Sequence, residues 1–145
     1  MSANKFFSEG QKKAIQKAIE AAELNTSGEV RVHIDSRCKG DVLDQAADTF
    51  KKLKMHETAL RNGVLFYLAI TDQKFAILGD KGINEKVPSD FWDSVRNAML
   101  AHFYKLEFTE GLIKGIDMAG EKLKTHFPHA SDDKNELNNE MSFGE

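Results

Sequence analysis

Two apolar runs, residues 64–71 and 75–78, stand on either side of a short polar break at residues 72–74. The second run stops at Gly79-Asp80-Lys81-Gly82, and glycine and aspartate are residues that favour turns. This pattern predicts a β-hairpin that carries an acidic, glycine-flanked turn to one edge of a sheet. The first run is apolar at nearly every position, which is typical of a strand covered on both faces.

A second kind of pattern precedes the hairpin. Residues 29–36 alternate apolar and polar side chains, which predicts a half-buried strand whose polar set includes His33 as an exposed spectator. Apolar side chains at helical spacing predict amphipathic helices that begin near Ser8, Asp41, Pro88 and Thr109. A strand, a helix of about twelve residues and another strand favour a right-handed parallel crossover. The hairpin then returns the third strand antiparallel, so an α/β fold with a mixed sheet is expected.

These strand directions bring several polar residues to one end of the sheet. Glu29 begins the first strand, Asn62 precedes the second, and Asp80 follows the antiparallel third, so the three are expected to converge. Asp90, at the start of the next helix, is a fourth candidate. Carboxylate, amide and backbone oxygens are ligands for calcium or magnesium, whereas zinc prefers histidine or cysteine, which are not predicted at this end. The alternative is structural, because Asp and Asn beside glycine also form turns and cap helices.

Composition and charge remove several functional classes. The chain has 145 residues, the size of one ordinary domain, and a formal net charge of -3 with basic residues scattered along it, so we expect no nucleic-acid binding. A single cysteine, Cys38, excludes an internal disulfide framework and fits a reducing compartment. Neither a signal peptide nor a run of about twenty apolar residues is visible, so we expect a cytoplasmic monomer without a membrane span. No serine, histidine and acid can be placed together, so nucleophilic catalysis is unsupported.

The composition changes near His129. Residues 1–128 are predicted to form the single domain, and residues 129–145 an acidic, disordered C-terminal tail that buries too little apolar surface to fold. The larger apolar residues of the tail are Leu137, Met141 and Phe143, at roughly helical spacing. They suggest either a docking motif for a protein partner or a tail without function.

Four short motifs, in order, resemble the TPM domain family, which is named for thylakoid-lumen, photosystem-repair and receptor-modulating members. The resemblance runs from about Ser8 to Phe127 and rests on the following segments: Thr26-Ser27-Gly28-Glu29-Val30-Arg31-Val32, Asn62-Gly63-Val64-Leu65, the hairpin from Thr71-Asp72-Gln73-Lys74 to Gly79, and Phe108-Thr109-Glu110-Gly111-Leu112 with Gly115. It implies a three-layer α/β/α sandwich, in which a small mixed sheet has helices on both faces.

The resemblance also implies divalent-cation binding near the glycine-rich strand ends. Carried over to this chain, the ligands are Glu29, Asn62, Asp80 and Asp90, and the domain is a regulatory or interaction module. Some plant members are credited with acid phosphatase activity, so the alternative is a metal-assisted phosphomonoester hydrolase in which Asp90 serves as general base or nucleophile. Two features depart from typical members: this chain shows no signal peptide or anchor, and it reads Gly79-Asp80-Lys81-Gly82-Ile83-Asn84-Glu85 where many have Gly-Tyr-Gly-Leu-Glu.

Overall fold

The structure is a computed structural model in which residues 2–128 and 141–144 are described. Within these residues four strands form one sheet in the order β3-β2-β1-β4. The strands are β1 (Glu29–Asp35), β2 (Gly63–Ala69), β3 (Lys74–Gly79) and β4 (Ser142–Phe143). β1 is parallel to β2 and to β4, and β2 is antiparallel to β3, so the mixed sheet and the hairpin are as predicted.

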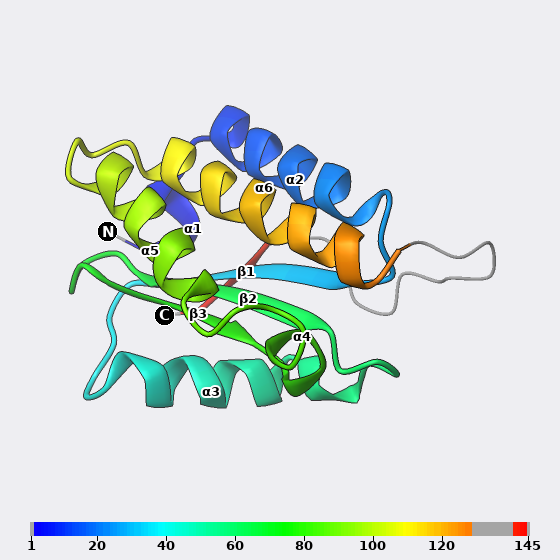
Figure 1. The fold of residues 1–145 in the computed structure, drawn as a ribbon. Coiled ribbons are helices and arrows are strands. Elements are labelled where there is room, and N and C mark those ends of the chain that lie inside the picture. Colours follow the sequence, from blue (N-terminus) through cyan, green and yellow to red (C-terminus); the bar gives the residue numbers. More distant parts are fainter. Residues whose placement is uncertain (1, 129–140, 145) are drawn as a thin grey trace.

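Helices cover both faces of this sheet (Figure 1). The longer helices are α2 (Glu9–Glu23), α3 (Val42–Lys52), α5 (Phe91–Phe103) and α6 (Phe108–His126), and the short ones are α1 (Ala3–Phe6), η1 (Met55–Glu57) and α4 (Lys81–Asn84). α2, α5 and α6 lie on one face and α3 on the other. The predicted three-layer α/β/α sandwich is therefore confirmed. Within the described residues no helix is both long and apolar enough to cross a membrane.

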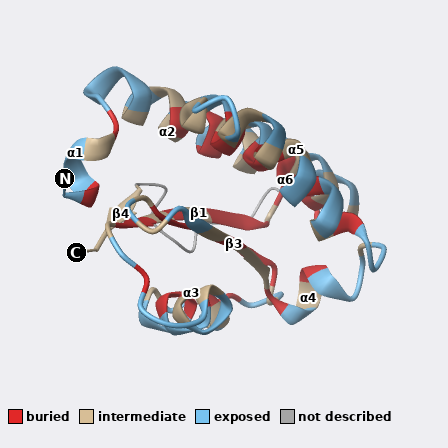
Figure 2. Ribbon diagram, turned by 90° about the vertical axis from the view of Figure 1, so that its left-hand side faces the viewer, coloured by how far each residue is buried: buried red, intermediate tan, exposed pale blue. Residues whose placement is uncertain are grey.

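The apolar run in β2 is explained by burial on both faces. All seven of its residues are buried. Residues 64–69 alternate between two cores, one on each face of the sheet, which lies between α3 and the other long helices in Figure 2. Val64, Phe66 and Leu68 pack in the larger core with α2, α5 and α6, while Leu65 and Tyr67 join the smaller core. The smaller core lies against α3, where Ala46 and Phe50 are buried. A strand between two helical layers must present apolar side chains to each, which removes the usual alternation.

Most helix starts follow local sequence chemistry. Ser8 and Gln11 form the predicted capping box, and the Asp41 side chain accepts a hydrogen bond from the amide of Asp44. The helices expected near Pro88 and Thr109 begin instead at Phe91 and Phe108. These shifts are small, because helix ends depend on the path of the preceding chain as much as on the cap residue.

The end of the chain differs from the sequence prediction. Residues 141–144 fall in the segment predicted to be disordered, yet Ser142 and Phe143 form β4 alongside His33 and Ile34 of β1. The Gly144 amide then donates to the Ile34 carbonyl oxygen at 2.8 Å. A two-residue strand is too short to show a pattern of apolar and polar residues. It forms because β1 presents backbone groups at its edge that β4 can pair with. The prediction for residues 129–140, including Leu137, lies outside the described residues.

Candidate functional site

Residues that the sequence analysis singled out lie together at the end of the sheet where β1 and β2 begin and β3 ends. Glu29 is in register with Gly63, and Val64 is in register with Gly79. The Glu29 amide donates to the Asn62 carbonyl oxygen at 3.4 Å, and the Asp80 amide donates to the Gly63 carbonyl oxygen at 2.9 Å. Glu29, Asn62 and Asp80 are all buried. The parallel crossover and the antiparallel return thus place three predicted residues at one edge.

Asp80 already has a cationic partner there. Its carboxylate accepts two hydrogen bonds from the Arg61 guanidinium, from Nε at 2.6 Å and from Nη2 at 2.8 Å, which is the bidentate geometry of a strong pair. These bonds raise the pKa of Arg61 and keep it charged. The Asp80 side chain also accepts from the Lys81 amide at 2.8 Å and so caps α4. The acidic turn is therefore the start of a short helix, a role that the sequence pattern did not reveal.

A second carboxyl group, Glu23, lies beside Glu29. Glu23 ends α2, and its Oε2 accepts a hydrogen bond from the Val30 amide at 2.6 Å. The side chains of Glu23 and Glu29 share a hydrogen bond, and Arg31 is the nearby cation. Burial, followed by the neighbouring Glu29 charge, raises the pKa of Glu23 to about 8. The half-buried Glu23 and the buried Glu29 thus form a carboxyl pair that favours retention of a proton near neutral pH.

Sequence reasoning missed Glu23. The sequence did contain a signal, because only a short connection that includes the turn residues Asn25-Thr26-Ser27-Gly28 separates Glu23, at the end of the helix, from Glu29, at the start of the strand. Helical periodicity, however, does not give the direction of a side chain at the last turn, where the backbone leaves the helix. Only the packing of α2 along β1 brings the two carboxyl groups together.

Asn62 and Asp90 occupy different situations. Asn62 Nδ2 donates to Ser27 Oγ at 3.4 Å, whereas Asn62 Oδ1 is buried and accepts no hydrogen bond from the described residues. A buried amide oxygen without a donor is unusual and is the kind of atom that a cation satisfies. Asp90 is exposed and its side chain makes no capping hydrogen bond. Within residues 2–128 and 141–144 that side chain forms no hydrogen bond or ion pair with Asn62 or Asp80. The convergence therefore includes three of the four predicted residues.

These groups fit a hard cation in part. Over the described part of the chain, no three His, Cys, Asp or Glu side chains gather in a group that could hold a metal ion. The residues at hand are two carboxyl groups, Glu23 and Glu29, and the amide oxygen of Asn62. Magnesium is commonly held by one or two carboxylates with retained water, and calcium by more oxygens. The donor chemistry suits either ion, with Asp80 neutralised by Arg61.

A second polar network lies near the C-terminal end of β1, beside β4. His33 Nδ1 is 2.7 Å from Ser142 Oγ, and His33 Nε2 is 2.9 Å from Asp35 Oδ1. The Tyr67 hydroxyl donates to Asp35 Oδ2 at 2.6 Å, and burial together with this bond raises the pKa of Tyr67. His33 was expected to be an exposed spectator, but its side chain is only 13% exposed. That expectation is wrong, because β4 covers the edge where His33 lies.

The same network assembles a serine, a histidine and an acid, which the sequence analysis did not expect. A serine nucleophile also needs donors for the developing oxyanion. The nearby Gly144 amide already donates to the Ile34 carbonyl oxygen, and Ser142 Oγ has a second acceptor at the Val32 carbonyl oxygen, 3.5 Å away. The geometry therefore describes a latch that fastens β4 to β1.

Replacement of His33 by phenylalanine tests this latch. His33→Phe keeps an aromatic ring over Tyr67 but removes both ring hydrogen bonds, so the Gly144 amide should exchange with solvent about five to ten times faster. Hydrogen exchange measured by NMR gives the result, and the Asp80 amide serves as an internal control. Unchanged exchange at Gly144 would contradict the role of His33.

The protein is a small α/β/α domain with polar groups at one edge of a mixed sheet. We call these groups, Glu23, Glu29, Asn62 and Asp80, the strand-end cluster. The sequence model of the TPM domain family matches residues 2–122, and the chain belongs to this family. Among curated proteins, none matches this chain.

Structural comparison gives the same fold. The NMR structure of BA42 protein from the psychrophilic bacterium Bizionia argentinensis is 48% identical in sequence, with 97% of each chain covered and a TM-score of 0.90. The N-terminal domain of cg2496 protein from Corynebacterium glutamicum is 15% identical, covering 88% of this chain and 79% of that one, with a TM-score of 0.67. An N-terminal domain from P. gingivalis is 17% identical, covering 87% and 83%, with a TM-score of 0.69. The last two share the fold alone.

Proposed function

We propose that this TPM domain binds a divalent cation, calcium or magnesium, at the strand-end cluster and acts as a regulatory or interaction module. The observation that carries the proposal is the adjacent Glu23–Glu29 carboxyl pair, in which the pKa of Glu23 is raised to about 8, well above that of an isolated glutamate. A cation placed between two carboxylates removes their mutual repulsion and displaces the Glu23 proton.

Asn62 supports the same proposal. Its buried Oδ1 has no hydrogen-bond donor among the residues that the structure describes, and its backbone carbonyl oxygen is bonded to Glu29. Glu23 and Glu29 would provide the negative charge and Asn62 a neutral oxygen, with water completing the coordination. Asp80 would not ligate the ion directly, because its carboxylate is paired with Arg61, which places a positive charge at the same edge.

A titration with calcium and then magnesium, followed by amide-resolved NMR near pH 7.5, tests the proposal. Shifts are expected at residues 28–30 and 62–63. Glu29→Gln should weaken binding about tenfold or more, because it removes one of two anionic ligands. Glu20→Gln is the matched control, since Glu20 is an exposed acid on α2, the helix that ends at Glu23. Shifts confined to the acidic residues 130–140 would contradict the site.

The phosphatase alternative draws less support from these contacts. It needs Asp80 and Glu29 to hold an ion and Asp90 to act as base or nucleophile. The Asp80 carboxylate, however, already accepts hydrogen bonds from Arg61 and from the Lys81 amide. Cation-dependent hydrolysis of an aryl phosphate that is lost in Asp90→Asn would favour catalysis. Cation binding without turnover would favour the module.

A further inference from the structure

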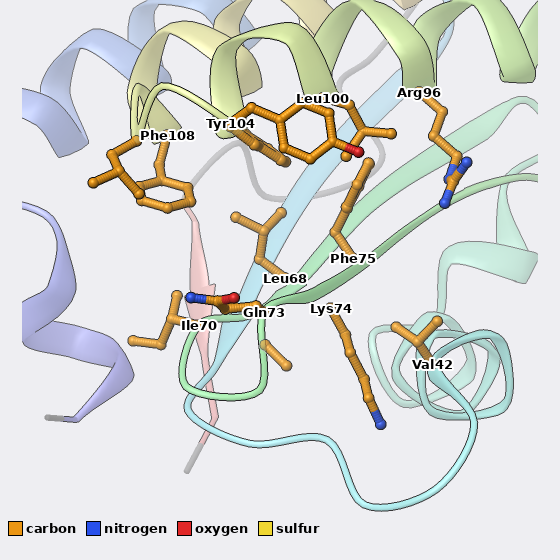
Figure 3. Close-up of a pocket in the computed structure, with 13 residues that line it drawn as sticks. Val42, Leu68, Ile70, Gln73, Lys74, Phe75, Arg96, Leu100, Tyr104 and Phe108 are labelled. Atoms are coloured by element: carbon orange, nitrogen blue, oxygen red, sulfur yellow. The ribbon is translucent and has the colours of Figure 1, made fainter.

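A cavity of about 480 Å³ lies where β2 ends and β3 begins (Figure 3). The carboxyl pair lies at the opposite end of the sheet, where β1 begins. Its floor is the end of β2 and the β2–β3 turn, and its roof is the end of α5 with the connection to α6. This volume lies within the range of small-molecule sites, which is about 300 to 1,000 Å³. The cavity shares no residue with the strand-end cluster.

The walls of the cavity are mostly apolar. Phe75 and Phe103 meet edge to face with ring centroids 5.0 Å apart, and Phe103 contacts Phe108 at 5.5 Å. Leu68 and Leu100 add aliphatic side chains to the lining (Figure 3). Rigid aromatic and aliphatic walls of this kind suit the apolar part of a ligand.

The rim of the cavity is strained and exposed. Gln73 and Leu106, both in the lining, have left-handed backbone with φ of 54° and 62°. Side chains other than glycine adopt this conformation at a cost, and such residues cluster at ligand-binding sites. Leu106 is also 73% exposed and Tyr104 is 80% exposed, so two large side chains stand at the mouth without protein cover.

The charges of the cavity are of one sign. Its lining includes Arg96 and Lys74 and no acid. Lys74 Nζ donates to the carbonyl oxygens of Gly40 and Cys38, at 3.0 and 3.4 Å, and points away from Leu100 and Tyr104. Arg96 is exposed, with its guanidinium carbon 5.8 Å from the Phe75 ring centroid, and has no carboxylate partner within the described residues. Arg96 is therefore the cation that a bound anion would meet.

We propose that this cavity binds a small amphipathic carboxylate, of the fatty-acid type. The alkyl chain packs against Leu68, Phe75 and Leu100, and the carboxylate pairs with the Arg96 guanidinium at the mouth. An apolar cavity with a cation and no acid selects against neutral and cationic molecules of the same shape. The site is independent of the proposed cation site.

Titration with octanoate, monitored by amide-resolved NMR, tests the proposal, with octylammonium as a probe of equal chain length and opposite charge. Octanoate should shift residues 73–75 and 100–106 and bind about tenfold more tightly than octylammonium, as expected for one charge-assisted hydrogen bond. Equal binding of the two probes, or octanoate shifts elsewhere, would overturn the proposal. Absence of shifts at millimolar octanoate would do the same.

Two variants with matched controls locate the contacts. Arg96→Gln should weaken octanoate about tenfold without lowering the melting temperature, whereas Lys105→Gln, which removes an exposed cation next to Tyr104 but outside the lining, should not. Leu106→Gly relieves a left-handed backbone and removes an apolar contact, so affinity should fall. Lys54→Gly relieves the same strain at φ 59° away from the cavity and should leave affinity unchanged. If Arg96→Gln and Lys105→Gln behave alike, Arg96 does not bind the carboxylate.

Discussion

Gly82→Ala is expected to lower the free energy of unfolding by about 3 kcal/mol, because the new methyl group has no room. A Cβ at Gly82 would lie 2.1 Å from the Leu60 carbonyl oxygen and 2.5 Å from the Arg61 carbonyl oxygen. Both contacts are with backbone, so a side-chain rotation cannot relieve them. The Gly82 amide also donates to the Arg61 carbonyl oxygen at 2.8 Å, and the displaced backbone would weaken this bond.

Urea denaturation of the variant and the wild type measures the effect. Gly10→Ala is the matched control, because Gly10 is an exposed helical residue whose nearest neighbour to an added Cβ is Ser8 Oγ at 3.9 Å. That control should be neutral or more stable by up to about 1 kcal/mol, since alanine favours helix. If Gly82→Ala is as stable as Gly10→Ala, the backbone at Leu60 and Arg61, just before β2, can move to accommodate the methyl group. The Arg61–Asp80 pair would then lack a rigid support.

Wild type is expected to lose stability relative to Glu23→Gln as pH rises from about 4.5 to 8. Burial and Glu29 raise the pKa of Glu23 from 4.5 to about 8, so between these values the folded protein binds more protons than the unfolded chain. The contribution is fully present below the unfolded pKa and is lost as pH passes the folded pKa. Glutamine keeps an oxygen acceptor for the Val30 amide and does not ionise.

At pH 8.5 Glu23→Gln should therefore be more stable than wild type by about 2 to 4 kcal/mol, and at pH 4 the two should be similar. Chemical denaturation at both pH values measures the difference, with Glu20→Gln as the control for the loss of one acid from α2. Saturating calcium or magnesium should restore stability at pH 8.5 in wild type more than in Glu23→Gln. Equal pH dependence in the two proteins would contradict the raised pKa of Glu23.

The pattern of the sequence predicted much of the sheet and little of its site chemistry. The double-sided burial of β2 and the hairpin to β3 could be read from residues 64–79, because apolar runs and turn residues are local properties. The predicted strand directions then placed Glu29, Asn62 and Asp80 at one end of the sheet, and the register in the structure agrees. The partners of those side chains could not be read in this way.

Each missed partner comes from a distant or unpatterned segment. Arg61 reaches Asp80 across 19 residues from a left-handed backbone position, which arginine rarely adopts and local propensity does not foresee. Ser142 reaches His33 across 109 residues from a strand of two residues. Neither contact leaves a periodic signal, because each depends on a single side chain.

The sequence by itself determined that β2 is covered on both faces, the strand directions and the edge at which polar residues gather, since these depend on burial patterns and connection lengths that extend over many residues. Only the tertiary structure decided which polar groups touch. Packing of α2 along β1 brought Glu23 to Glu29, the turn before β2 aimed Arg61 at Asp80, and the α5–α6 connection closed the apolar cavity under Tyr104. The physical reason is that hydrogen bonds and ion pairs depend on ångström-scale positions, whereas hydrophobic burial depends on area and tolerates displacement.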